Sequence, residues 1–179
     1  MCGLLNYLDD FVAPLDGTLR VRTFALVKQG KAYLVPRMIE IWLDLLSSPL
    51  HREGFQFVDV QNAAVDLATG ELVVHDLHLD VDTQALEAFQ RSEKGGREPA
   101  PIAPGRYPIE AWAYFGKGDA QSAPSTLLTL FQSTLNAFEF GVPETLRALE
   151  SLGNRVRVQD LGSPYKEDLA GRIAKLAAG

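Results

Sequence analysis

The residues of this chain best suited to chemistry are an alternating run of acidic and imidazole side chains. Asp76, His78, Asp80 and Asp82 share one face if their segment is an extended strand. Carboxylates and imidazoles are ligands of first-row metals. Alternate residues of a flat strand lie about 6–7 Å apart, however, too far for three of them to reach one ion through bonds of about 2 Å. The spacing therefore predicts a solvated strand face and no metal site.

The rest of the sequence contains no recognisable set of catalytic residues. The three histidines, His51, His75 and His78, have no serine or cysteine nucleophile in a recognisable context. Cys2 is the only cysteine, and it has no histidine near it in the sequence to activate it. No pair of carboxylates lies in an apolar setting that would separate their pKa values. We expect no catalytic residue and no bound cofactor.

The stretch that organises the chain is residues 30–60, in which a strand, a helix and a second strand follow one another. Residues 31–35 are β-prone, and Pro36 ends the run because proline cannot donate to a sheet. Residues 37–48 predict a helix that buries all but a thin polar edge. Residues 55–60 predict a second strand parallel to the first, reached by a crossover connection.

The turn between that first strand and the helix lacks the parts of a phosphate site. A phosphate is held there by backbone N–H groups of a glycine-rich loop at a helix N-terminus. The turn Val35-Pro36-Arg37 has no glycine and no lysine-serine pair, and Pro36 removes one donor. The sequence therefore predicts that no nucleotide binds at this turn.

Several segments resemble the HPr kinase and phosphoenolpyruvate-carboxykinase-like P-loop family. The resembling segments are GKAYLVP at residues 30–36, REGFQFV at 52–58, VDLATGEL at 65–72, YPIEAWA at 107–113 and the helical residues 127–152. The resemblance spans residues 19–178. It implies an α/β fold, in which a mixed sheet with flanking helices forms a kinase-like core without the P-loop.

The chain departs from that family where the chemistry is done. Active members carry G-x-x-x-x-G-K-[ST] at the first turn and an acidic pair after the next strand, where this chain has Val60 and Gln61. Asp59 would supply at most one carboxylate. Phosphoryl transfer needs both positioning and charge neutralisation, so we predict a protein that is not an enzyme. The alternative is a residual nucleotide-dependent phosphotransferase with an unorthodox site around Lys31, Arg37 and Asp59.

Degenerate kinase-like proteins of this kind are similar to accessory proteins of crocagin-type ribosomal peptide pathways, which are thought to present a precursor peptide to tailoring enzymes. That resemblance implies precursor or leader peptide and tailoring enzymes as partners. A free strand edge can bind an extended peptide as an added strand. On the alternating segment 19–27 we expect Arg20, Arg22 and Phe24 to be the readers of such a peptide, and the two arginines favour an acidic one.

Trp112 and Tyr114 are further candidates for peptide contact. They alternate with Ile109, Ala111 and Ala113 in the predicted strand 106–115, so one face of that strand is aromatic. This face either forms a peptide platform or lies under the C-terminal helices. We favour cover, since large aromatic side chains are mostly buried.

Composition sets the class of protein. The chain has 179 residues, 46% of them hydrophobic and 22% charged, which predicts one globular domain. The net charge of -6 argues against a nucleic-acid partner. One cysteine, no signal peptide and no apolar run of membrane-spanning length favour the reducing cytoplasm.

The remaining elements follow from periodicity and turn residues. Residues 4–13 predict a helix that packs either on the domain or on a second copy in a homodimer. Residues 92–106 predict a flexible loop and residues 124–178 a helical C-terminal part. The other expected elements are hairpins at residues 19–35 and 63–75, a strand at 75–82, helices at 83–94, 124–138, 143–152 and 164–178, and a short strand at 156–158.

Overall fold

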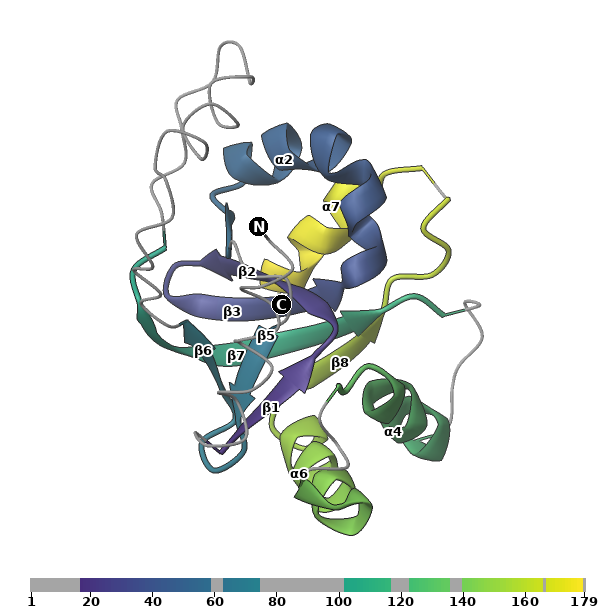
Figure 1. Ribbon diagram of the computed structural model, residues 1–179. Coiled ribbons are helices and arrows are strands. Elements are labelled where there is room, and N and C mark those ends of the chain that lie inside the picture. Colours follow the sequence, from purple (N-terminus) through teal and green to yellow (C-terminus); the bar gives the residue numbers. More distant parts are fainter. Residues whose placement is uncertain are drawn as a thin grey trace, which may run out of the picture.

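The computed structural model describes residues 17–58, 63–74, 102–116, 123–135, 140–165 and 167–178. Its eight strands form one mixed sheet in the order β1-β5-β6-β7-β3-β2-β4, with β8 also paired to β7 (Figure 1). The strands are β1 (Thr18–Val21), β2 (Thr23–Lys28), β3 (Lys31–Pro36), β4 (Gln56–Phe57), β5 (Ala63–Asp66), β6 (Glu71–Val74), β7 (Gly105–Tyr114) and β8 (Arg157–Asp160). The helices are η2 (Arg37–Trp42), α2 (Leu43–Arg52), α4 (Ala123–Gln132), α6 (Val142–Gly153), α7 (Leu169–Ala174) and η3 (Lys175–Ala177). The predicted α/β fold with a mixed sheet flanked by helices is confirmed.

Helices cover both faces of the sheet. On one face α4 and α6 bury Leu130, Leu149 and Leu152 in a cluster with strand residues. On the other face η2, α2 and α7 contribute Ile39, Leu50 and Ile173 to a second cluster. Figure 1 shows these helix pairs on opposite sides of β3 and β7. The sheet is therefore the middle layer of three.

The central strand–helix–strand unit is present. β4 is antiparallel to β2, and β2 is antiparallel to β3, so β4 runs parallel to β3 with β2 between them. β4 is only two residues long, and the end of the predicted strand at residues 59–60 lies outside the described residues. The predicted crossover between parallel strands is thus confirmed in direction.

Both predicted hairpins are confirmed. β2 and β3 are joined by Gln29 and Gly30, whose φ angles of 53° and 75° are those of a tight hairpin turn. β5 and β6 are antiparallel, and Gly70 precedes β6 with a φ of 72°. In that loop Asp66 Oδ1 accepts hydrogen bonds from the N–H groups of Ala68 and Thr69, at 2.8 and 2.9 Å.

The single strand predicted for residues 19–27 is wrong, because the chain bends at Arg22. β1 pairs with β5, whereas β2 pairs with β3 and β4. The bend is held from outside the strand: the N–H of Arg22 donates to the Ser133 carbonyl at 2.6 Å, and the N–H of Leu135 donates to the Arg20 carbonyl at 2.8 Å. Residues 133–135 therefore lie along β1 and do not continue the helix predicted to 138.

Strict alternation along the last long strand is also wrong. The register with β3 pairs Ala32 with Ile109 but Tyr33 with Ala111, so one extra residue, Glu110, is accommodated. Ile109 consequently shares a cluster with Trp112 and not with Ala111. The β-bulge is what moves Ile109 to that face.

The C-terminal part differs from expectation at its third helix. α7 begins at Leu169 and not at residue 164. Asp168 precedes it in a left-handed conformation with a φ of 59°, and its Oδ1 accepts a hydrogen bond from the Gly171 N–H at 3.0 Å. Among the described helices, none is long and apolar enough to cross a membrane.

Some expectations fall outside the described residues: the helix at 4–13, the strand at 75–82 and the helix at 83–94. Of the predicted loop 92–106, residues 102–104 are described without regular structure, and residues 105 and 106 already belong to β7.

Candidate functional site

The carboxyl ends of three strands meet at one edge of the sheet. β3 and β8 both pair with β7 in the parallel sense, so β3, β7 and β8 end on the same side, at Pro36, Tyr114 and Asp160. In α/β proteins ligands bind beyond the carboxyl ends of parallel strands. This edge is therefore the expected place for a ligand site.

A carboxylate at this edge, that of Asp160, binds backbone N–H groups through its Oδ1. It accepts hydrogen bonds from the N–H groups of Gly116 at 2.8 Å and Gly162 at 2.6 Å. A Cβ added at Gly116 would lie 2.3 Å from Oδ2 of this carboxylate. Asp160 thus fastens the ends of β7 and β8 together.

The connection from β3 to the following helix contains no loop. β3 ends at Pro36, and the 3₁₀ helix η2 begins at the next residue, Arg37. This confirms that no glycine-rich loop is inserted at the turn.

A hollow lies beside this turn, at the bend between β1 and β2. It has a volume of about 350 Å³ and is lined by Arg22, Arg37, Met38 and Ile41. We call it the arginine hollow. Two guanidinium groups and two apolar side chains face it, and among the described side chains that line it none is acidic. The side chain of Arg22 is exposed, and Arg37 is half-buried.

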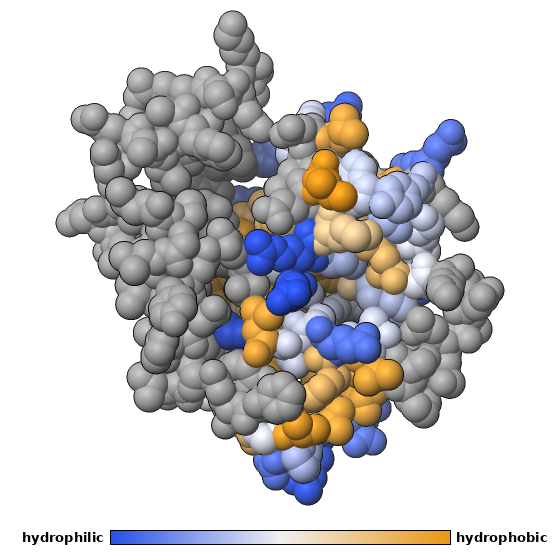
Figure 2. All heavy atoms as spheres, turned by 45° about the vertical axis from the view of Figure 1, so that its right-hand side comes forward, coloured by the Kyte–Doolittle hydropathy of each residue, from blue (hydrophilic) through white to orange (hydrophobic). Residues whose placement is uncertain are grey.

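An apolar ridge continues from the arginine hollow along the helix. It consists of Met38, Ile41 and Leu45, which are 45%, 70% and 72% exposed. Residues three apart lie one above the other in a 3₁₀ helix, so Met38 and Ile41 stack, and Leu45 follows one turn later in α2. Figure 2 shows apolar surface over α2, next to strongly hydrophilic surface.

The prediction that this helix buries nearly all its apolar residues is therefore wrong. Ile39, Leu46 and Leu50 face the sheet and are at most 4% exposed, but the ridge faces outward. The helix packs on the sheet along one face only. Because it is apolar on both faces, its second apolar face is left exposed and can bind a partner.

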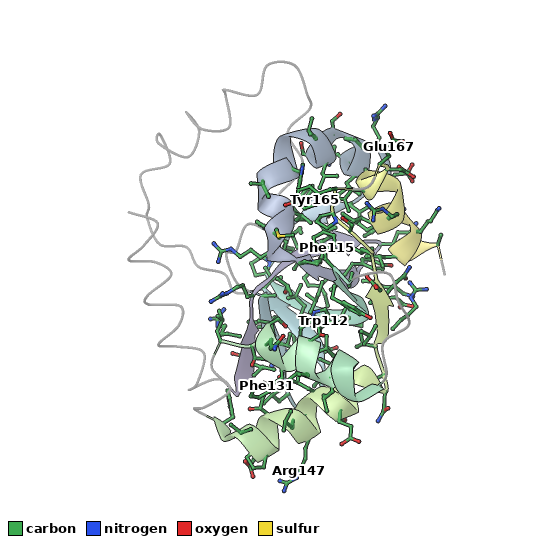
Figure 3. All side chains as sticks on the ribbon, turned by 90° about the vertical axis from the view of Figure 1, so that its right-hand side faces the viewer. Trp112, Phe115, Phe131, Arg147, Tyr165 and Glu167 are labelled. Carbon is green, nitrogen blue, oxygen red and sulfur yellow. The ribbon has the colours of Figure 1, made fainter. Side chains whose placement is uncertain are left out.

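An aromatic pair lies next to the same helix. The rings of Trp42, the last residue of η2, and Tyr165 meet edge to face with centroids 5.7 Å apart. Tyr165 is 81% exposed. Figure 3 places Tyr165 and Phe115 toward the end of the molecule that carries α2, with Arg147 at the opposite end.

The structure separates the five predicted peptide-contacting residues. Arg20 and Trp112 are each only 2% exposed, so neither reaches the surface. Phe24 and Tyr114 are half-buried, and only Arg22 is exposed, in the arginine hollow. Strand addition is obstructed along β1, where residues 133–135 bond to it, and along the end of β2, where β4 pairs with Leu26 and Val27.

Trp112 lies where we favoured it, under the C-terminal helices. It belongs to the cluster that contains Leu130 of α4 and Leu149 of α6. The predicted platform of Trp112 and Tyr114 is thereby reduced to Tyr114 at the carboxyl end of β7.

Two residues of the alternative nucleotide site lie far apart along β3. Lys31 begins β3 and Arg37 follows its end, which separates them by about 20 Å at 3.3 Å per residue. Lys31 Nζ instead contacts Glu110 Oε2 at 2.8 Å. This ion pair raises the pKa of Lys31 and lowers that of Glu110. Asp59 lies outside the described residues.

A second hollow of about 430 Å³ lies between the end of α2 and α7, where Arg52, Glu53 and Asp168 are all exposed. Within the described ranges no three acidic, histidine or cysteine residues are grouped as a metal site would require. The predicted metal-like segment at 76–82 is not part of those ranges.

Sequence reasoning missed most of the surface that the structure brings together. The sequence predicted burial for Met38, Ile41 and Leu45 and gave no role to Tyr165. The available signal was that residues 38–46 are apolar on more sides than one layer of packing can cover. Comparison with known proteins adds no assignment, since no family model, curated protein or solved structure matches this chain.

Proposed function

We propose that this protein is a non-catalytic peptide-binding protein, and that the arginine hollow receives an acidic group of the peptide. The observation that carries the proposal is the hollow itself, in which Arg22 and Arg37 stand beside Met38 and Ile41. A guanidinium binds a carboxylate through paired hydrogen bonds, and the neighbouring apolar side chains favour a ligand that also carries apolar residues.

The charge of the whole chain makes the hollow distinctive. The protein carries a net charge of -6, yet none of the described side chains that line this hollow is acidic. Basic ligands would be attracted to most of the protein, whereas an acidic ligand is attracted here. Local charge complementarity of this kind directs a partner to one place on the surface.

The scaffold and the biological setting of the proposal come from the sequence resemblance. We infer a degenerate kinase-like core without the P-loop, whose direct β3–η2 junction is consistent with a lost nucleotide site. The ligand would be a precursor peptide of a ribosomal peptide natural-product pathway, presented to its tailoring enzymes in the cytoplasm. The alternative phosphotransferase has less support, since Lys31 and Arg37 lie at opposite ends of β3.

The test is a selection from a displayed library of random peptides on the immobilised full chain. We expect enriched peptides to contain acidic residues and to lose binding to Arg22→Glu by about tenfold or more. Arg147→Glu is the matched control, because it makes the same charge change on α6, where the side chain is 74% exposed. Enrichment that is indifferent to Arg22, or no enrichment, would refute the proposal.

A thermal shift separates the two functions. A nucleotide at one hundred times its Kd stabilises a protein by about 2.7 kcal/mol. We expect no such shift from ATP with Mg²⁺ and a clear one from an enriched peptide. A rise in Tm with ATP and Mg²⁺ alone would instead favour the phosphotransferase.

A further inference from the structure

The arginine hollow and the apolar ridge form one continuous surface. Met38 and Ile41 belong to both, and Leu45 extends the ridge away from the hollow. At about 2.0 Å per residue in η2 and 1.5 Å in α2, the ridge is about 12 Å long. This length matches about two turns of an α-helix.

The occupied strand edges favour a helical ligand over one that adds as a strand. The described neighbours of β1 and β2 already occupy the strand edges beside Arg22, so an added strand would have to displace them. An outward-facing stripe of apolar residues on a helix is a surface on which a second helix can pack through its own apolar stripe.

We propose that the peptide binds as an amphipathic helix, with a carboxylate in the arginine hollow and apolar residues on Ile41 and Leu45. This inference rests on the proposed function and specifies its ligand. Because the hollow lies at one end of the ridge, the carboxylate lies at one end of the ligand's apolar stripe. The ligand pattern is therefore one acidic residue flanked on one side by apolar residues at helical spacing.

Because the acidic residue of the ligand binds at one end of the ridge, it also fixes the direction in which the ligand lies along the ridge. Arg22 is exposed at the bend, and its backbone N–H is fixed to Ser133, so its side chain can be changed without disturbing the fold. A peptide that carries lysine in place of the acidic residue should bind Arg22→Glu better than it binds the wild-type protein. Such a charge swap identifies a direct contact, which a general loss of binding does not.

The experiment uses an enriched peptide labelled with fluorescein, and fluorescence anisotropy with the full-length protein. We expect Ile41→Asp and Leu45→Asp to weaken binding by at least about tenfold. Leu128→Asp is the control: Leu128 is 55% exposed on α4, which covers the other face of the sheet. Alanine substitutions in the peptide should weaken binding with a period of three to four residues, and the peptide should gain helical circular dichroism on binding.

Two results would overturn the helical ligand and leave the proposed function standing. One is a period of two in the alanine scan, which indicates an extended peptide. The other is binding that requires Arg22 but tolerates Ile41→Asp and Leu45→Asp. If none of the enriched peptides bound the protein in solution, the proposed function itself would be refuted.

A second experiment distinguishes peptide binding by this surface from binding to a membrane. An apolar ridge beside arginines is also a feature of helices that lie on anionic lipid. The net charge of -6 opposes that, so we expect no sedimentation with phosphatidylserine vesicles. Sedimentation that is lost in Ile41→Asp but kept in Leu128→Asp would overturn the proposal in favour of a lipid surface.

Discussion

Asp66 shows how one side chain fixes a turn and a distant strand together. Its Oδ1 accepts two backbone N–H groups of the β5–β6 loop, and its Oδ2 pairs with Arg106 of β7. The Arg106 pair is the largest cause that holds the pKa of Asp66 below its ordinary value of 3.8, followed by the backbone bonds. The carboxylate is mostly buried, so its partners are poorly replaced by water.

We predict that Asp66→Asn lowers the free energy of unfolding by about 1–3 kcal/mol at neutral pH. Because the pKa is lowered in the folded state, the stabilisation is complete above pH 3.8 and is lost as the pH falls through the folded-state value. The free energies of unfolding of the two proteins, measured in urea at a series of pH values, should differ by a constant amount near neutral pH. This difference should shrink in acid. A gap of the same size at the most acidic pH would contradict this account.

At the residue scale, local chemistry was predictable from the sequence and exposure was not. The glycine of the β5–β6 loop and the missing loop after Pro36 follow from backbone rules that act within a few residues. The burial of Arg20 does not, because it depends on the bend at Arg22. That bend is imposed by hydrogen bonds to residues 133–135, more than a hundred positions away.

At the element scale, the helix η2–α2 has two apolar faces with different roles. One face, with Ile39, Leu46 and Leu50, is at most 4% exposed against the sheet. The other is the apolar ridge. The sequence predicted a helix here with apolar residues on more than one face, but the pattern alone could not tell which face the rest of the protein leaves uncovered. Only the placement of the neighbouring elements decides that.

We predict that equal truncations on the two faces have unequal costs. Leu50→Ala removes a fully buried side chain and should lower the free energy of unfolding by about 3 kcal/mol. Leu45→Ala, at 72% exposure, should change it by less than about 0.5 kcal/mol. Both substitutions are leucine to alanine in α2, so helix propensity is matched. Equal costs in urea unfolding would mean that the ridge is packed and not free to bind.

At the scale of the whole molecule, the two core clusters are joined through the strands they share. Leu34 belongs to the cluster under α4 and α6, whereas its neighbours Tyr33 and Val35 belong to the cluster under η2, α2 and α7. Alternate residues of β3 thus face opposite layers. Neither cluster can lose its strand residues without disturbing the other, so we expect the two layers to unfold together.

The two tryptophans of the chain report these two layers separately. Trp112 is buried in the first cluster and Trp42 packs against the second. We therefore predict that Trp42→Phe, which keeps Trp112, and Trp112→Phe, which keeps Trp42, each unfold in one transition. In each variant the fluorescence midpoint in urea should equal the midpoint by far-ultraviolet circular dichroism, since a two-state domain gives coincident transitions with every probe. If the Trp42 signal changed before the circular dichroism while the Trp112 signal did not, the layer carrying the arginine hollow would unfold on its own, and the shared strands would not couple the layers.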